Sequence, residues 1–201
     1  MAYITTAELK TYLDITSSSL DTLLGVLLDN AQSVINNYCD RDFAPSAASS
    51  KYFDADVDVD GMTLWLGDED LASTDDLAIT NGDGVAVDVS SEIAYRPRRL
   101  TPYYAIDLLP SSSKAWTGKS NGDDIDAIQV YAWWGYSKTA PENIEQALYR
   151  LASFMFRQRS SSSDVDKPLV LDTGMVLMPS EMPNDVRQML TGYRRRSAIY
   201  W

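Results

Sequence analysis

The sequence predicts an α+β protein, and three observations lead to that class. Apolar residues recur with the helical period over residues 20–38 and again after Pro141. Between these stretches, residues 51–135 hold short apolar runs, two-residue alternation and hairpin-turn residues, all of which are typical of strands. A further apolar segment and one more helical stretch follow near the C-terminus. We therefore expect a small antiparallel helical bundle core, a β-rich insertion and an extended C-terminal arm.

The expected boundaries follow these changes of period. The helical core takes residues 1–45 and 139–162, the insertion takes residues 50–136, and the arm takes residues 163–201. The simplest packing sets helix 20–38 against the helix that starts near Pro141, because each stretch has only one apolar side to bury. The β region would then project from this core.

The helical core is predicted from capping residues and apolar stripes. Thr5 and Glu8 have the spacing of a capping box, which predicts a short helix through about Leu13. Thr139 and Glu142 repeat that spacing before the second long helix. Pro141 would lie in its first turn, where a missing N–H costs no helical hydrogen bond.

The insertion is predicted as a series of antiparallel strands. The stretch KYFDADVDVDG alternates strictly, so we expect Ala55, Val57 and Val59 to face inward and the aspartates outward. The stretch NGDG predicts a hairpin turn, with VAVDVS as a strand after it. The last strand is IQVYAWW, after which Gly135 would allow a turn back to the helical core.

The C-terminal arm combines two very short strands with a terminal helix. The stretch PLVLDTGMVLMP predicts strands about a turn at residues 172–174, too short and apolar to stand alone. They would pack on their own domain or add to a sheet of another chain. Pro183 would open the terminal helix and Gly192 would end it. The basic end could meet a phosphate backbone or an acidic protein surface, or form a solvated tail.

Composition narrows the function classes. The net charge is −12, and the first 95 residues hold 18 acidic and 3 basic side chains, so this part should repel nucleic acid. The chain has no histidine, which removes the commonest proton-transfer group, and we expect no enzyme. Its single cysteine, Cys39, fits a reducing compartment and a small buried role. No apolar stretch is long enough to cross a membrane, and the first residues resemble no signal peptide, which favours synthesis in the cytoplasm.

Candidate chemical motifs are weak. Asp56, Asp58 and Asp60 resemble the first half of a calcium-binding EF-hand loop, but Gly67 stands where its bidentate glutamate is needed. An amphipathic strand is the simpler interpretation, with weak divalent-metal binding as the alternative. Ser111 and Lys114 match an acyl-enzyme spacing without its companion motifs. We expect no catalytic residue and no cofactor.

Four stretches together resemble the head–tail connector, or adaptor, proteins of tailed bacteriophages. They are LKTYLDITSSSLDTLLGVLLDNAQSVINNYCDRDF, AYRPRRLTPYYAIDLL, IQVYAWWGYSKTAPENIEQALYRLASFMFRQR and MPNDVRQMLTGYRRR. The first resembles the family's short and long helix with the residues that close them, and the second resembles its strand pair with a central proline. The third resembles its junction of strand, Gly-Tyr, Pro and helix, and the fourth resembles its terminal helix with a basic end. The long β region and the acidic strand depart from the family pattern.

The resemblance implies a structural virion protein in the neck between capsid and tail, made in the bacterial host. It implies a homo-oligomeric ring of twelve subunits that binds the portal protein above and tail-completion or stopper proteins below. Double-stranded DNA would pass through the ring without sequence-specific binding. The implied portal or subunit contacts are Leu169, Val170, Leu171, Met175, Val176, Leu177, Arg187, Arg194, Arg195, Arg196, Tyr200 and Trp201. The implied junction between the two lobes is formed by Trp133, Trp134, Gly135, Tyr136 and Pro141.

Two alternatives remain open from the sequence. One is another ring-forming virion protein, such as a tail-completion protein. The other is a divalent-metal-binding module that uses the cluster of aspartates between Asp54 and Asp60.

Overall fold

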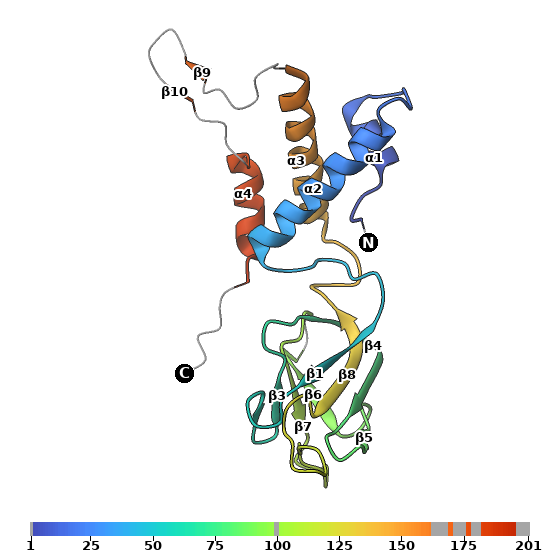
Figure 1. Ribbon diagram of the computed structural model, residues 1–201, viewed down its shortest axis with the longest axis vertical. Helices are drawn as coiled ribbons and strands as arrows, with labels where there is room; N and C mark the ends of the chain where they lie inside the picture. Colours follow the sequence, from blue (N-terminus) through green and yellow to red (C-terminus); the bar gives the residue numbers. More distant parts are fainter. Residues whose placement is uncertain (1, 99–100, 162–168, 171–175, 178–181, 196–201) are drawn as a thin grey trace. The chain divides into compact units, whose positions relative to one another are not determined.

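The computed structural model describes residues 2–98, 101–161, 169–170, 176–177 and 182–195 (Figure 1). Over these residues the chain forms helices and antiparallel strands that lie in separate parts of the sequence, so the predicted α+β class is confirmed. The chain divides into two compact units. We call residues 2–41 and 141–201 the helical unit, and residues 42–140 the β unit.

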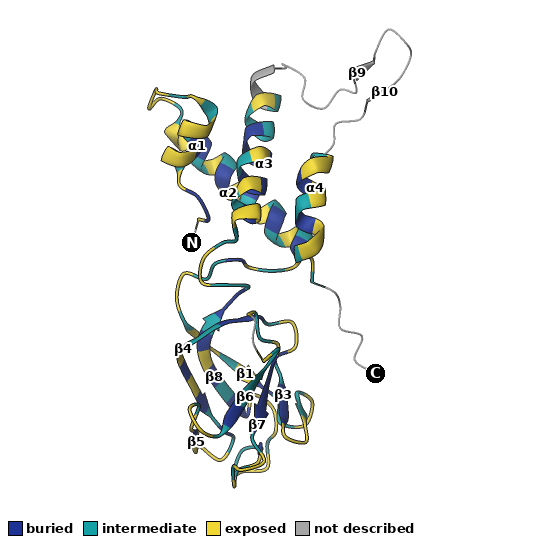
Figure 2. Cartoon of the chain, turned by 180° about the vertical axis from the view of Figure 1, so that it is seen from behind, coloured by how far each residue is buried: buried dark blue, intermediate teal, exposed yellow. Residues whose placement is uncertain are grey.

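The helical unit begins with two helices that the sequence predicts closely. Helix α1 spans Thr6–Leu13, and both hydrogen bonds of the capping box between Thr5 and Glu8 are present. Helix α2 spans Asp21–Cys39 and ends at Asp40, which takes the left-handed conformation that closes many helices. Buried and exposed residues form separate stripes along these helices (Figure 2). The stripe of α2 is buried as Leu24, Leu28, Ala31, Ile35 and Cys39.

Two further helices pack on this pair. Helix α3 spans Glu142–Ser161 and buries Ile144, Leu148 and Leu151 completely against α2 and α4. Helix α4 spans Asn184–Leu190 and continues into a 3₁₀ turn, η1, at Thr191–Tyr193. Since α2 and α3 pack together, the expected pairing of the two long helices exists, while their description as an antiparallel bundle stays a prediction.

Three predictions about ends of elements are wrong. The amide of Glu145 donates to the carbonyl of Pro141, so Pro141 caps α3 and Thr139 lies outside it. A proline carbonyl can accept the first helical hydrogen bond, and no serine or threonine cap is needed. Gly192 lies within η1 and so does not end the terminal helix at α4. The stretch VAVDVS is strand only at Ala86–Val87, because Asp88 turns the chain by accepting hydrogen bonds from Ser90 and Ser91.

The β unit is built from two antiparallel four-stranded sheets (Figure 1). The first sheet has the order β1-β8-β4-β5, and the second has the order β2-β3-β7-β6. The strands of the first are β1 (Ser49–Phe53), β8 (Ile128–Trp134), β4 (Leu71–Thr80) and β5 (Ala86–Val87). Those of the second are β2 (Val59–Asp60), β3 (Thr63–Trp65), β7 (Ala105–Leu108) and β6 (Ile93–Arg96).

The two sheets share one hydrophobic core. Ile79, Ile128 and Val130 enter it from the first sheet, and Leu64 and Ile106 enter it from the second. A bridge between Leu71 and Tyr103 connects the two sheets at one corner. Because both sheets bury one face in a common core, their other faces point away from each other.

The acidic segment is not the strand that its alternation predicts. Strand β1 ends at Phe53, residues 55–57 turn, and only Val59 and Asp60 rejoin a sheet. Of the expected inward row, Ala55 and Val59 are partly buried against the core, whereas Val57 is 73% exposed. The reason is local: the amide of Asp54 donates to the carboxylate of Asp58 at 2.8 Å, a side-chain bond that competes with strand pairing.

Candidate assembly surfaces

The two short strands of the arm are present and pair only with each other among the described strands. Strand β9 is Leu169–Val170 and strand β10 is Val176–Leu177, joined in antiparallel register. Four of the contacts implied by the resemblance thus lie in one small hairpin. Leu171, Met175, Arg196, Tyr200 and Trp201 lie outside the described residues, and a role of the arm in binding another chain stays a prediction.

The basic end of the helical unit lies against the C-terminus of α2. The amide of Arg195 donates to the carbonyl of Cys39 at 2.9 Å, and its Nε donates to the carbonyl of Asp40 at 3.1 Å. The guanidinium of Arg194 lies 5.1 Å from the ring centre of Tyr38. Arg195 places positive charge on a helix-terminal carbonyl, where the helix dipole favours it, and Arg194 covers the ring of Tyr38. They therefore have an intramolecular role that the sequence did not predict, whereas Arg187 is exposed on α4.

The junction residues organise the end of the β unit. The amide of Tyr136 donates to the carbonyl of Asp42 at 2.7 Å, and the ring of Tyr136 packs on Phe43. Gly135 has a φ of +155°, and a Cβ there would lie 2.9 Å from Cδ of Pro45. Trp134 is buried in the sandwich core and donates from Nε1 to the carbonyl of Ser49 at 2.8 Å. The prediction that these residues fix one lobe against the other stays a prediction.

The aspartates of the acidic segment accept hydrogen bonds from the backbone. Besides the bond to Asp58, Oδ1 of Asp54 accepts the amide of Asp126 at 2.7 Å. The carbonyl of Asp124 accepts the amide of Ala55, so this turn is held against the loop before β8. Across the part of the chain that the structure describes, no group of three or more His, Cys, Asp or Glu side chains could hold a metal ion.

Charge is concentrated on the β unit. Residues 42–140 hold 17 acidic and 7 basic side chains, a net charge of −10 out of the total of −12. All four lysines of this unit form ion pairs within it: Lys51 with Glu69, Lys114 with Glu92, Lys119 with Asp123 and Lys138 with Asp75. Arg98 is exposed and makes no ion pair with any described residue. The acidic excess therefore dominates the surface of this unit.

The outer face of the first sheet carries two exposed tyrosines and has an acidic end, and it was not predicted from the sequence. We call it the tyrosine face. Its outward residues, aligned by strand register, include Ser50, Tyr52, Ala78, Thr80, Ala86, Gln129, Tyr131 and Trp133. At one end of this face, Nε1 of Trp133 donates to the exposed carboxylate of Asp76 at 3.2 Å. Tyr52 is 54% exposed and Tyr131 is 41% exposed. Nε2 of Gln129 donates to Oγ of Ser50 at 2.9 Å and to the hydroxyl of Tyr52 at 3.3 Å, which orients that ring.

The outer face of the second sheet is different. We call it the arginine face, formed by Arg96, Trp65 and Tyr104 over the buried side chains of Asp107 and Thr63. Nε of Arg96 donates to Oδ2 of Asp107 at 2.7 Å, and this bond raises the pKa of the guanidinium. Oγ1 of Thr63 donates to the other oxygen of Asp107, also at 2.7 Å. The guanidinium lies 5.7 Å from the ring centre of Trp65, which stacks on Tyr104.

Sequence periodicity could have identified part of the tyrosine face. Gln129, Tyr131 and Trp133 alternate with buried residues in a strand that was predicted at its full length. The pairing of these residues with Tyr52 and Ala78 depends on strand register across distant segments, and one sequence carries no signal for it.

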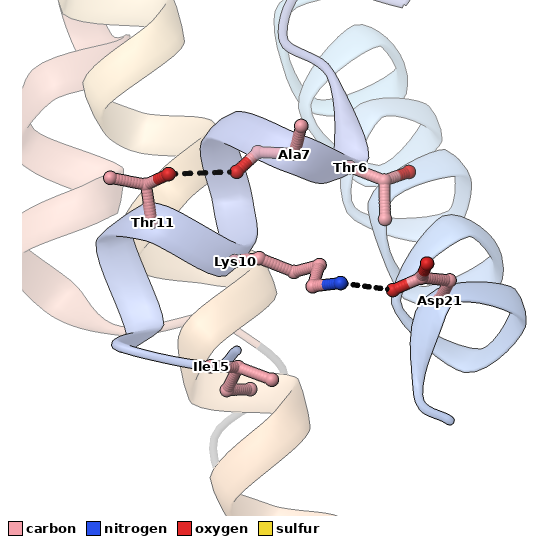
Figure 3. A pocket seen from close by; sticks show the side chains of 6 residues that line it. All are labelled: Thr6, Ala7, Lys10, Thr11, Ile15 and Asp21. Atoms are coloured by element: carbon pink, nitrogen blue, oxygen red, sulfur yellow. Dashed lines mark hydrogen bonds and ion pairs between the residues drawn. The ribbon is translucent and has the colours of Figure 1, made fainter. Parts of the chain in front are cut away.

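A shallow hollow of the helical unit lies between α1 and the start of α2 (Figure 3). Its charged side chains, Lys10 and Asp21, bind each other at 2.6 Å, and Oγ1 of Thr11 donates to the carbonyl of Ala7. The two charged side chains of the hollow are therefore paired with each other. Cys39 is fully buried, and burial raises the pKa of its thiol to about 11, so the thiol stays protonated at neutral pH.

Comparison with known proteins shows that the chain is similar in fold to chains of two solved structures. No protein-family model and no curated protein sequence matches the chain. A chain of the solved structure "Neck of empty GTA particle computed with C6 symmetry" matches with a TM-score of 0.55 and 15% identity. A chain of "Virion of native gene transfer agent (GTA) particle" matches with a TM-score of 0.50 and 18% identity. Each match covers 96% of this chain and 89% of the other.

Among the described residues, no helix has the length and apolarity that crossing a membrane requires.

Proposed function

We propose that the chain is a structural virion protein of the neck, where a ring of copies connects the portal to the tail and encloses the DNA channel. One observation carries the proposal: both units together, over 96% of the chain, share their fold with a chain from the neck of a gene transfer agent particle. A match of this extent includes the helical unit and the β unit in one chain. It agrees with the four stretches that resemble the adaptor proteins of phages.

The charge of the β unit supports a place beside DNA. A net charge of −10 on 99 residues repels a phosphate backbone, and its lysines are already paired with carboxylates of the same unit. A surface of this kind lets double-stranded DNA pass without binding to it. The same charge argues against a role in gripping DNA.

The proposed partners are further copies of the chain, the portal protein and the tail-completion or stopper proteins. A ring of twelve, as the resemblance implies, is compatible with the sixfold symmetry with which the neck of the gene transfer agent particle was computed. The arm of residues 163–201 is the proposed portal contact, because a two-stranded hairpin of this length needs a further surface to become stable. The chain would be made in the host cytoplasm and would reside in the virion neck.

A mass measurement tests the proposal. The purified protein is mixed with the portal protein encoded beside it, and the mass of the eluting complex is measured by light scattering. We expect co-elution with one copy per portal chain, and loss of the complex when residues 163–201 are deleted. A chain that elutes separately from assembled portal rings at micromolar concentration contradicts the proposal.

A further inference from the structure

We propose that contacts between the two ends of the β unit stabilise the helical unit, because they shorten the chain that links α2 to α3. These contacts involve Asp42, Phe43, Gly135 and Tyr136, and we call them the end clamp. The inference concerns the folding of a single chain, so it does not depend on the proposed ring.

The end clamp continues the pairing of two strands. Strands β1 and β8 are the first and the last strand of the β unit. They pair in antiparallel register from Ser49 opposite Ala132 to Phe53 opposite Ile128. This pairing brings the segment that enters the β unit beside the segment that leaves it.

Specific contacts hold the entering and the leaving segment together. The amide of Tyr136 donates to the carbonyl of Asp42 at 2.7 Å, and the centres of the Tyr136 and Phe43 rings lie 5.6 Å apart. Phe43 is fully buried. A Cβ on Gly135 would lie 2.9 Å from Cδ of Pro45, so the two backbones approach each other closely there. The end clamp is therefore a packed part of the β unit and stays closed while that unit is folded.

The helical unit is made of two segments that the β unit separates in the sequence. Helix α2 precedes the β unit, helix α3 follows it, and the two helices pack together. The 99 residues of the β unit link the two segments. When the end clamp is closed, the link that matters is only six residues long, namely Asp42 and residues 136–140.

The length of this link sets an entropic cost. Bringing the ends of a chain together costs more entropy as the chain becomes longer, with a 3/2 power dependence on its length. A link of six residues in place of 99 should raise the equilibrium constant for packing α2 on α3 by up to about seventyfold. The folded β unit thus acts on the helical unit as a cross-link would, through the chain alone.

The coupling is reciprocal, as any coupling between two equilibria must be. Packing of α2 on α3 keeps the ends of the β unit close together and so favours the closed end clamp. A partner that binds the folded helical unit should therefore also stabilise the β unit.

Insertions of flexible Gly-Ser residues in the full chain test the inference. Two outer variants carry ten or twenty such residues between Thr139 and Ala140, in the link between the end clamp and α3. Two inner variants carry the same residues between Asn121 and Gly122, within the part that the clamp closes off. Both inner positions are exposed, and no atom lies within 4 Å of the place that a Cβ on Gly122 would take.

Hydrogen exchange in native buffer measures the protection of the amides of α2, which lies far in sequence from both insertion points. Tryptophan fluorescence shows whether the β unit of each variant is folded. We expect the outer insertions to lower the protection of α2 about fourfold for ten residues and about ninefold for twenty. The inner insertions should leave it unchanged, because the closed clamp excludes them from the link.

Three results would overturn the inference. Unchanged protection in all four variants would mean that the whole β unit counts as the link. Equal losses in outer and inner variants would mean that the insertions destabilise the chain in general. An outer loss that is the same for ten and twenty residues would mean local damage at the insertion point. A variant whose β unit does not fold should lose protection of α2 by up to about seventyfold, because its clamp is open, and full protection there would also contradict the inference.

Discussion

Substitution of Gly135 by alanine should destabilise the β unit by about 2 to 4 kcal/mol. A Cβ at this position would lie 2.9 Å from Cδ of Pro45, well inside ordinary carbon–carbon contacts of about 3.5 to 4.0 Å. It would also lie 3.1 Å from the carbonyl oxygen of Asp42, which is a tight contact. Asp42 cannot easily move, because its carbonyl accepts the amide of Tyr136. The φ of +155° adds a conformational cost for any residue with a side chain.

Urea unfolding followed by tryptophan fluorescence measures this loss, because the four tryptophans among the described residues all lie in the β unit. With a typical urea dependence, the midpoint should fall by about 1 to 2 M. Gly84→Ala is the matched control, since Gly84 has a φ of +79° but no atom lies within 4 Å of the position that its Cβ would take. Its cost should be near 1 kcal/mol, about that of the conformation alone. A loss at Gly135 no larger than that at Gly84 would refute the close approach of the 42–45 segment.

Three further predictions concern other parts of the chain. Leu148→Ala should lower the free energy of unfolding by about 2 to 5 kcal/mol, because Leu148 is fully buried in the helical unit. Val26→Ala, at an exposed position of α2, should change it by less than about 0.5 kcal/mol. Unfolding followed by circular dichroism at helical wavelengths measures both. Hydrogen bonds from Ser90 and Ser91 lower the pKa of Asp88 to about 2, so its stabilising contribution is present above the ordinary carboxyl pKa and is lost as the pH falls toward 2. Asp88→Asn should therefore reduce the difference in melting temperature between pH 5 and pH 2, and an unchanged difference would argue against these bonds. Millimolar calcium should leave the melting temperature unchanged, because Asp54 and Asp58 already accept backbone hydrogen bonds, and a rise that saturates with calcium would favour the metal-binding alternative.

The elements that the sequence predicts well are those determined by residues close together in the chain. The capping box of Thr5 and Glu8 and the stripe of α2 depend on residues three or four positions apart, and both occur as expected. The NGDG stretch forms the turn between β4 and β5, where the amide of Gly84 donates to the carbonyl of Asn81.

The wrong or missing predictions have two causes: side-chain hydrogen bonds that compete locally with strand pairing, and contacts between segments far apart in the sequence. Alternation in residues 54–60 predicts a strand, but the carboxylate of Asp58 accepts the nearby amide of Asp54 and the chain turns instead. The carboxylate of Asp54 accepts the distant amide of Asp126, which holds this turn against the loop before β8. The two outer faces of the sandwich depend on the register between segments that lie far apart in the chain, as in the pairing of Tyr52 with Gln129. The sequence therefore predicts a strand such as β8 at its full length, whereas the surfaces that distant strands form together could be found only from the fold.

A density map of the neck isolated from particles that contain this protein tests the central claim most directly. The account predicts a ring of this chain between portal and tail that encloses the DNA channel. A map in which the neck lacks this fold, or in which the chain occurs only outside the neck, would contradict the claim.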